Sequence, residues 1–377
     1  MEKEISVLFV TTNLNYNGAK KYIVEVVNEL ANRNIKVGIL FDSGPLAEKL
    51  DPKVNKYHVR LRGIGLDSIS RLKLAVKAAL IARKEGYKVI HAESANSVIS
   101  QRVLRLFHKA KVVETIHHVW GNDAERAQAT KKIKQRADKL ITISPTVFRI
   151  LADFGLKRGD IEIIQNGINT KEFARVNKEE VENLRKSLGF GKGDPVLVSV
   201  SRVSKAKNFE ALVNWLPFIL ADFPSARLVI VGDSGIGSRK HLDKLIQKIK
   251  SLELSRHIVC VGGKTHIKNY LGLARIFTLP TVAAGLSVLE AMAAGLPVVA
   301  SKVRIAADPE TVVDKSTGLT FERGNWRQWA EDTKYLLDRP DTAKKFGEAG
   351  KKRVNAFFTV EGHADSLEKI YLNLVKT

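Results

Sequence analysis

Two basic side chains follow a strand-like run in the second half of the chain. The apolar run 196–200 leads into Arg202, and Lys207 stands five positions later, just before a helix-like segment. An arginine offers a planar fork of hydrogen-bond donors and a lysine a compact positive charge, so the pair is suited to a diphosphate. The competing interpretation is an ordinary loop, because basic residues are common on solvated surfaces.

A stretch of small residues forms the second candidate site. Gly285, Leu286 and Ser287 lead into a helical segment that carries Glu290 and ends at Gly295. The first N–H groups of a helix are unpaired and bind anions, and a carboxylate such as that of Glu290 accepts hydrogen bonds from ribose hydroxyls. A favourable interaction with the helix dipole is the alternative for Glu290.

Two positions in the first half of the chain could also contact a ligand. Gly18 stands near the start of a helix expected from about Lys20, where a glycine lets a phosphate approach backbone N–H groups. His117 and His118 follow the strand-like run 111–116, and adjacent residues of a strand point to opposite faces, so at most one lies in the site. A histidine there could position a substrate hydroxyl. A plain loop glycine and a histidine bonded to a loop carbonyl are the structural alternatives.

Several signatures are absent, and their absence narrows the chemistry. No two aspartates are two residues apart, so the sequence has no Asp-x-Asp motif for a metal-bound diphosphate. It has no Gly-x-x-x-x-Gly-Lys-Ser/Thr loop, no Gly-x-Gly-x-x-Gly after the first strand and no Gly-x-Ser-x-Gly elbow. The only cysteine is Cys260, which excludes a disulfide framework and a thiolate cluster. We therefore expect neither a bound metal ion nor a cofactor.

The elements that must position these residues alternate regularly. Short apolar runs rich in β-branched residues are separated by helix-length segments, as in parallel sheets that are buried on both faces. The pattern predicts two doubly wound α/β domains that face a cleft, with ligands beyond the carboxyl ends of the strands. The expected strands are 6–10, 36–41, 88–91, 111–116, 139–144, 162–165, 196–200, 227–231, 258–261, 276–280, 297–300 and 318–321.

The chain is strongly basic. Its 377 residues include 62 Lys and Arg against 40 Asp and Glu, a net charge of +22. Residues 51–150 hold 21 basic and 8 acidic residues, and three basic segments, 71–84, 102–109 and 131–136, lie among them. Basic and apolar positions alternate at helical spacing in the first two, which suits an anionic membrane surface. A solvated helix face is the alternative. Nucleic acid is disfavoured, because the segments lack aromatic stacking residues and zinc-finger spacing.

The sequence favours a cytoplasmic location. It has no run of 18 apolar residues, and its first residues are charged, so we expect neither a membrane-spanning helix nor a secretion signal. Docking through the basic region would place the protein on the inner face of the cell membrane.

Taken in order, the motifs resemble those of the family 4 glycosyltransferases, which use nucleotide sugars. The matches extend from Gly18 to Gly318, and the ordered set is specific although each motif alone is ordinary. They include Asn166-Gly167-Ile168-Asn169, Arg202-Val-Ser-Lys-Ala-Lys207, Gly232-Asp233 and Glu290-Ala-Met-Ala-Ala-Gly295. The resemblance implies the GT-B fold. Its Rossmann-like domains would be residues 1–170, with the helix 359–377 packing back on them, and residues 171–358, which bind the donor.

The resemblance also implies roles for the candidate residues. The residues that would contact the nucleotide sugar are Gly18, Arg202, Lys207, Gly285, Leu286, Ser287 and Glu290. Within this set, Arg202 and Lys207 would hold the diphosphate and Glu290 the ribose. His117 would lie beside the reacting carbon of the sugar as the catalytic residue. The family is typically independent of metal ions, and fixed cations and N–H groups would stabilise the charge on the leaving diphosphate.

The expected function is that of a retaining hexosyltransferase. The sugar would move from a nucleotide sugar, UDP-linked by analogy, to a cell-envelope glycan or a lipid-linked acceptor. One position departs from the family, because the first Glu of its Glu-x7-Glu motif falls on Val282 or Ala284. Two alternatives therefore stay open. One is a nucleotide-binding subunit or scaffold without turnover, and the other is a nucleotide-sugar epimerase of the same fold.

Overall fold

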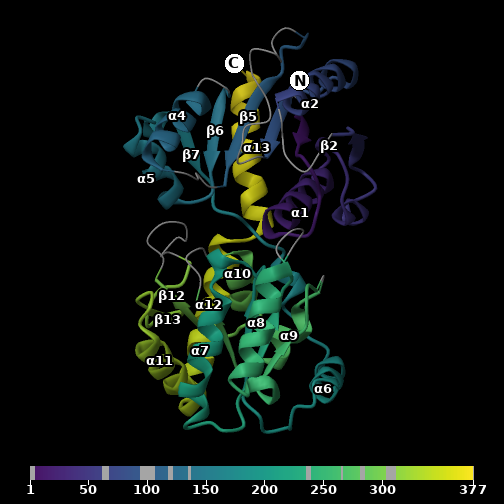
Figure 1. The fold of residues 1–377 in the computed structure, drawn as a ribbon. Coiled ribbons are helices and arrows are strands. Elements are labelled where there is room, and N and C mark those ends of the chain that lie inside the picture. Colours follow the sequence, from purple (N-terminus) through teal and green to yellow (C-terminus); the bar gives the residue numbers. More distant parts are fainter. Residues whose placement is uncertain are drawn as a thin grey trace. The chain divides into compact units, whose positions relative to one another are not determined.

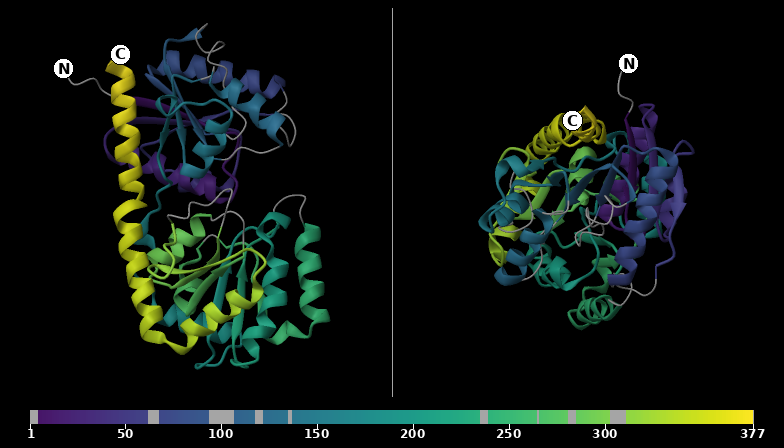
Figure 2. Two further views of the ribbon diagram at one scale, coloured as in Figure 1. Left: turned by 90° about the vertical axis from the view of Figure 1, so that its left-hand side faces the viewer. Right: turned by 90° about the horizontal axis from the view of Figure 1, so that it is seen from above.

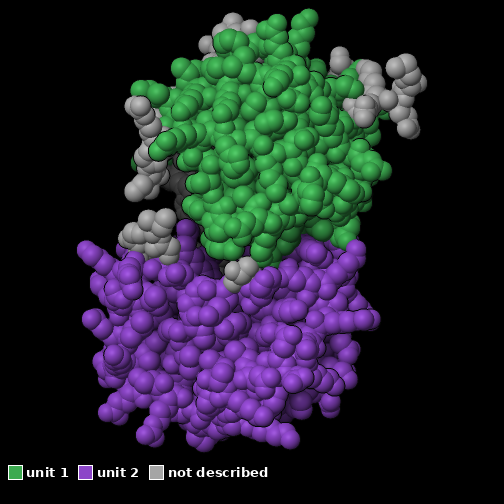
Figure 3. All heavy atoms as spheres, turned by 90° about the vertical axis from the view of Figure 1, so that its right-hand side faces the viewer, with its two compact units in different colours: residues 1–167, 360–377 green, residues 168–359 purple. Residues whose placement is uncertain are grey.

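The structure is a computed structural model that describes residues 5–61, 68–93, 107–117, 122–134, 137–234, 239–264, 266–280, 285–302 and 311–376. The chain divides into two compact units, which Figure 3 shows in green and purple. The first unit contains residues 1–167 and 360–377, and the second contains residues 168–359. The polypeptide therefore leaves the first unit once and returns to it with its last helix.

The first unit is built on a seven-stranded parallel sheet with the order β3-β2-β1-β4-β5-β6-β7. Its strands are β1 (Ser6–Val10), β2 (Lys36–Phe41), β3 (Asn55–His58), β4 (Val89–Glu93), β5 (Lys111–Ile116), β6 (Lys139–Thr142) and β7 (Ile161–Ile163). Successive strands proceed in one direction from β1 to β3 and in the other from β4 to β7. Open α/β sheets bind ligands beyond the carboxyl ends of the strands at such a reversal, here β1 and β4.

Helices pack on both faces of this sheet. They are α1 (Gly18–Asn32), α2 (Ser68–Glu85), α4 (Asp123–Lys134), α5 (Pro145–Asp153) and α13 (Val360–Lys376), with short 3-10 turns η1 (Pro45–Lys49) and η2 (Arg158–Asp160). Successive side chains of β1 point to opposite faces of the sheet. Leu8 and Val10 pack with Leu74 and Ala78 of α2, whereas Phe9 points the other way and stacks on the ring of His91.

The last helix, α13, completes the first unit by packing against α1. Figures 1 and 2 show it in yellow, running along the sheet of that unit. Val360, Ala364 and Leu367 are buried at the three- and four-residue steps of one helix face. Arg33, the C-cap residue of α1, donates to the carboxylate of Asp365 at 2.5 Å. This hydrogen bond joins α1 to α13, two helices of the first unit that lie far apart in the sequence.

The second unit is built on a six-stranded parallel sheet with the order β10-β9-β8-β11-β12-β13. Its strands are β8 (Val196–Val200), β9 (Arg227–Val231), β10 (Ile258–Cys260), β11 (Ile276–Leu279), β12 (Val298–Ser301) and β13 (Gly318–Phe321). The strand order reverses between β8 and β11, so this unit repeats the topology of the first.

Seven helices of the described residues accompany this sheet. They are α6 (Lys178–Ser187), α7 (Phe209–Leu220), α8 (Arg239–Ser251), α9 (Lys268–Leu273), α10 (Leu286–Ala293), α11 (Trp326–Asp338) and α12 (Pro340–Phe357), with 3-10 turns η3 (Thr170–Glu172), η4 (Lys205–Lys207) and η5 (Leu254–Arg256). Aromatic rings fill much of the core. The ring of Trp329 stacks on Trp215 and Phe321 at centroid distances of 4.3 and 4.8 Å.

The fold predicted from the sequence is confirmed. Every expected strand is present, with ends that differ by two residues at most. The strand β3 was not predicted, because its residues Asn55–His58 are mostly exposed at the sheet edge and lack an apolar pattern. The helix expected from about Lys20 begins at Gly18. Most of the basic segment 102–109 lies outside the described residues.

Candidate functional site

Arg202 and Lys207 lie just beyond the carboxyl end of β8, at the strand reversal of the second unit. Arg202 is in the connecting loop and Lys207 ends the turn η4, directly before α7. Arg202 is exposed and Lys207 is half-buried. Burial, together with the nearby charge of Arg202, lowers the pKa of Lys207 to about 8. A bound anion would relieve both effects, so this pair favours a negatively charged ligand.

A close backbone approach holds this loop in place. Gly232, at the end of β9, lies so near the loop that a Cβ atom on it would be 1.8 Å from the carbonyl oxygen of Ser201. The N–H of Val203 donates to the carbonyl of Asp233 at 2.9 Å. Only glycine fits at this distance. The Gly232-Asp233 pair therefore fixes the backbone on either side of Arg202.

The helix α10 contributes the second part of this site. It follows β11, which is the neighbour of β8 in the sheet, so the two groups found in the sequence come to the same sheet edge. Gly285 is the N-cap and Leu286 the first helical residue, and no side chain of the described residues caps the helix. N–H groups at the start of a helix, here those of Leu286 and Ser287, suit an anion.

Glu290 lies one turn further along α10 and is 5% exposed. The helix stops where the sequence predicted, with Gly295 at a φ of 79° directly after the C-cap residue. Val282 and Ala284, on which the missing family carboxylate falls, lie outside the described residues. The second unit therefore brings together Arg202, Lys207 and the start of α10 with Glu290 on neighbouring segments.

Gly18 and His117 belong to the first unit. Gly18 is the first residue of α1, and the N-cap Asn17 accepts a hydrogen bond from the backbone N–H of Lys20 at 3.0 Å. One of the donors that a phosphate would use is therefore already occupied, in contrast to α10. His117 directly follows β5, as expected, and His118 lies outside the described residues.

His117 is hydrogen-bonded to a buried carboxylate, and no bond to a loop carbonyl is present within the described residues. Its Nε2 lies 2.8 Å from Oε2 of Glu93, the last residue of the neighbouring strand β4. Glu93 is 1% exposed. Burial alone would raise the pKa of Glu93, but the hydrogen bond from His117 opposes this effect, and the pKa lies below its usual range. The pair is thus a carboxylate with a hydrogen-bonded imidazole.

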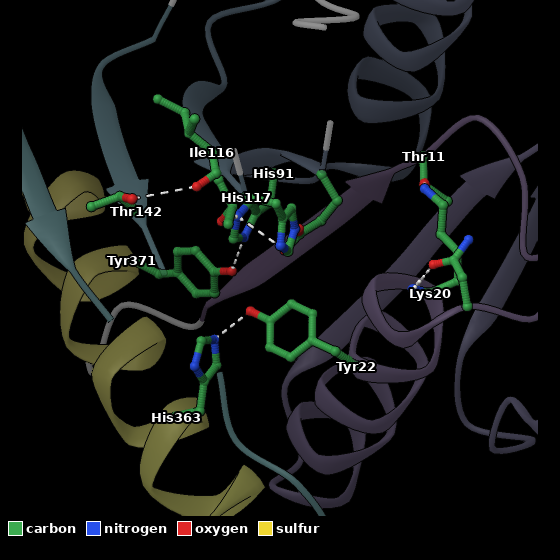
Figure 4. A network of polar contacts seen from close by, with 12 residues as sticks. Thr11, Lys20, Tyr22, His91, Ile116, His117, Thr142, His363 and Tyr371 are labelled. Carbon is green, nitrogen blue, oxygen red and sulfur yellow. Dashed lines mark hydrogen bonds and ion pairs between the residues drawn. The ribbon is translucent and has the colours of Figure 1, made fainter. Parts of the chain in front are cut away.

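Lys20 is a further polar residue at the same sheet edge. Its ammonium donates to the hydroxyl of Thr11, the residue after β1, as Figure 4 shows. Burial lowers the pKa of Lys20 to about 8, although the charge of Glu93 opposes this shift. The strand reversal of the first unit therefore collects Thr11 after β1, Glu93 at the end of β4 and His117 after β5.

Sequence reasoning missed Glu93 and Lys20. The signal that would have found Glu93 is the one that singled out His117, a polar residue at the carboxyl end of an apolar run. Among the described residues, no three His, Cys, Asp or Glu side chains are grouped as metal ligands would be. Within the same residues, no helix is both long and apolar enough to cross a membrane.

Two doubly wound units, each with polar residues at its strand reversal, have the two-domain α/β architecture of the GT-B class. Residues 16–172 match the model of "Glycosyltransferase Family 4", and residues 180–353 match that of "Glycosyl transferases group 1". The chain is 31% identical over 276 residues to the GDP-mannose-dependent monoacylated alpha-(1-6)-phosphatidylinositol monomannoside mannosyltransferase of Corynebacterium glutamicum, a match that covers 69% of this chain and 70% of that one. The chain belongs to the family 4 glycosyltransferases.

Solved structures support the fold. A glycosyltransferase from Rickettsia africae superposes with a TM-score of 0.86 at 21% identity, covering 99% of both chains. The Anabaena protein HepE, solved in complex with UDP and glucose, superposes with a TM-score of 0.83 at 18% identity, covering 97% of this chain and 99% of that one. The GT-B fold and the glycosyltransferase class that the sequence predicted are confirmed.

Proposed function

We propose that this glycosyltransferase moves a hexose from a nucleotide sugar to a glycan or lipid-linked acceptor, with retention of the anomeric configuration. The observation that carries the proposal is the strand reversal between β8 and β11. Two cations follow β8, and a helix N-terminus with a buried carboxylate follows the neighbouring strand β11, an arrangement that suits a nucleoside diphosphate.

Each donor contact has its own chemistry. Arg202 and Lys207 bind the diphosphate, the N–H groups of Leu286 and Ser287 after the N-cap Gly285 donate to its oxygens, and the Glu290 carboxylate accepts from the ribose. These fixed donors stabilise the negative charge that develops as the sugar leaves. The chain's own residues supply this charge compensation, and we propose that no metal ion takes part.

We propose a UDP-linked donor. HepE binds UDP in its solved complex, and this supports the choice of base. The Corynebacterium glutamicum relative is named as GDP-mannose-dependent, so guanosine is the competing base. Within the first unit, Gly18 approaches the donor and His117 lies beside the reacting carbon in this proposal.

Nucleotide binding is tested by thermal unfolding with UDP, GDP, ADP and their sugar derivatives. A ligand that binds only the folded chain raises the melting temperature. We expect a shift with UDP that is lost in Arg202→Ala/Lys207→Ala and kept in Lys250→Ala, a lysine at the end of α8. A shift with GDP alone would identify the donor as GDP-linked and not UDP-linked. No shift with any nucleotide would overturn the proposal.

Product analysis separates transfer from the alternatives. Incubation with a UDP-sugar and an acceptor extract gives a glycosylated product if the chain is a transferase. Conversion of the sugar without an acceptor indicates an epimerase, and binding without any conversion indicates a scaffold. The anomeric configuration of the product is read from its proton coupling constant.

We further propose that the first unit docks on an anionic membrane to reach its acceptor. The helix α2 exposes Ile69, Leu72 and Leu80 by 75%, 53% and 50% of their surface, and Lys73 and Lys77 are exposed beside them. Exposed apolar residues among cations fit an anionic lipid surface. The phosphatidylinositol-based acceptor in the name of the Corynebacterium relative supports a lipid substrate.

Sedimentation with vesicles tests this docking. We expect binding to vesicles of phosphatidylglycerol and phosphatidylcholine that weakens with salt and is lost in Ile69→Ser/Leu72→Ser/Leu80→Ser. Phe357→Ser is the matched control, because Phe357 is 65% exposed but lies in the second unit. Equal binding by both variants would overturn a role for α2.

A further inference from the structure

Three histidines lie around one buried carboxylate in the first unit. Glu93 ends β4, His91 stands two positions earlier on the same face of that strand, His117 follows β5, and His363 comes from α13. Figure 4 shows the rings of His91 and His117 next to each other and that of His363 beside Tyr22. Their hydrogen bonds distinguish two structural histidines from one that is available to a ligand.

His91 is fully partnered within the fold. Its Nδ1 lies 2.5 Å from the hydroxyl of Tyr371, and its Nε2 lies 2.7 Å from the hydroxyl of Thr115. The ring is completely buried, and burial lowers its pKa to about 4. A neutral imidazole donates one hydrogen bond and accepts one, so these two hydroxyls satisfy it.

His363 is satisfied as well. Its Nδ1 lies 2.7 Å from the backbone carbonyl of Gln165, which can only accept, so Nδ1 carries the proton. Its Nε2 then accepts from the hydroxyl of Tyr22 at 2.5 Å. Burial lowers the pKa of His363 to about 4, so this ring is also neutral.

His117 differs from both. Its Nε2 lies 2.8 Å from a carboxylate oxygen of Glu93, which accepts the hydrogen bond. The proton of the neutral ring is therefore on Nε2, and Nδ1 has no hydrogen-bond partner among the described residues. The His117 side chain is 8% exposed, against 0% for Glu93. Of the three rings, it is the one with a nitrogen left for a ligand.

Glu93 is well placed to fix this ring. Its second oxygen, Oε1, makes no hydrogen bond to any described residue and lies 3.5 Å from Nε2 of His91, which is already bonded to Thr115. Lys20 on α1, Tyr22, Tyr371 and His363 are also close enough to interact electrostatically with this carboxylate. The hydrogen bond to His117 is thus the one that this buried carboxylate makes among the described residues.

We infer that Glu93 is the positioning residue of His117. The carboxylate holds the imidazole in the tautomer with the proton on Nε2 and so presents Nδ1 as an acceptor for a hydroxyl group of the substrate. The role of the hydroxyl rests on the proposed function, whereas the tautomer does not.

The tautomer is measured directly by nitrogen NMR on protein with ¹⁵N-labelled histidine. The chain has nine histidines, and the signals of His117 are identified by their loss in His117→Ala. We expect the Nε2–H tautomer in the wild type. In Glu93→Gln we expect the Nδ1–H form to appear, because an amide donates as well as accepts. The Nδ1–H form in the wild type, or signals unchanged in Glu93→Gln, would overturn the inference whatever the activity.

Kinetics test the consequence for transfer. We expect Glu93→Gln to lower kcat 10- to 100-fold with the KM for the nucleotide sugar changed less than threefold. In a His117→Ala background the same substitution should change kcat less than twofold, because Glu93 acts through His117. A full additional loss in that background would assign Glu93 a purely structural role and overturn the inference.

The neighbouring strand offers a matched control. Glu114 of β5 is 2% exposed and precedes Thr115, so it points to the opposite face of the sheet. We expect Glu114→Gln to leave kcat within twofold and the His117 signals unchanged. An equal loss in both variants would indicate a general cost of removing a buried carboxylate. Absence of transfer in the wild type would contradict the proposed function alone, since the NMR result stands without it.

Discussion

The two units share a topology but differ in what their strand reversals hold. In the second unit, the exposed Arg202, the half-buried Lys207 and an uncapped α10 provide positive charge and N–H groups. In the first, Asn17 caps α1, and Glu93 and His117 form a buried hydrogen-bonded pair. The comparison teaches that one sheet plan supports either an anion site or a hydroxyl site, depending on which side chains end the central strands.

Acid should destabilise the first unit most. His91 and His363 have pKa values of about 4 in the folded chain, against 6.5 when unfolded. Above pH 6.5 neither state binds these protons, and below it the unfolded state does, so stability falls as the pH drops from 6.5 to 4. Together, the two histidines lower the unfolding free energy by up to roughly 2–3 kcal/mol for each pH unit in this range. Urea unfolding at pH 7 and 5 measures the loss.

The histidine origin of this acid effect can be isolated. His91→Gln/His363→Gln should flatten the dependence between pH 6.5 and 4.5, even where it lowers stability at pH 7. His266→Gln, with a side chain that is 68% exposed, should keep the wild-type slope. An unchanged slope in the double variant would show that carboxylates, and not these histidines, cause the acid loss.

Gly232→Ala should damage the second unit next most strongly. The added Cβ would lie 1.8 Å from the carbonyl of Ser201, so the loop before Arg202 must move. We expect a loss of about 2–4 kcal/mol in unfolding free energy, as for other over-packed or strained sites. Denaturant unfolding measures it. Gly193→Ala is the control, because nothing lies within 4 Å of its Cβ position. An equal, small effect in both would contradict the close approach.

Two desolvated lysines allow a matched comparison of the units. Lys20 and Lys207 both have pKa values lowered to about 8 by burial. We expect Lys207→Met to weaken UDP binding by about 1.5–3 kcal/mol, the value of a charge-assisted hydrogen bond. Lys20→Met should change the UDP affinity less than threefold. Calorimetric titration measures both, and equal losses would show that the anion site is not confined to the second unit.

The helix cap of the first unit should give the smallest effect. The side chain of Asn17 accepts from the N–H of Lys20 at 3.0 Å. We expect Asn17→Ala to lower the unfolding free energy by about 1 kcal/mol. Asn15→Ala, in the exposed loop before the helix, should have less than half of that effect in the same denaturant titration. A neutral Asn17→Ala would show that the cap is not what distinguishes α1 from α10.

The sheets could be predicted well because a strand that is buried on both faces is a short run of mostly apolar residues, which is visible locally in the sequence. Runs such as 6–10 and 196–200 are apolar apart from one serine each, as is typical of strands covered on both faces. The sequence also placed Arg202 and Lys207 between a strand and a helix, since both lie close together along the chain. Local patterns failed where the residues in contact are far apart in the sequence. His91 meets Tyr371 across 280 positions, and no spacing in either segment indicates that pairing.

For the same reason, only one residue of the polar pair in the first unit was singled out from the sequence. His117 was singled out as a polar residue after an apolar run, but its partner Glu93 was not, because only the pairing of β4 with β5 brings the two together. Charge along the chain marked α2 as basic. The exposure of its apolar residues could come only from the packing of the opposite face on the sheet.

The return of α13 to the first unit has a consequence for biosynthesis. On a translating ribosome, the whole of the second unit emerges before the segment Val360–Lys376. Until then, Tyr22 and His91 lack their partners His363 and Tyr371. The first part of the chain to be made is therefore the last to acquire its finished core. In the interim, the nascent chain presents an unfinished surface to chaperones and proteases.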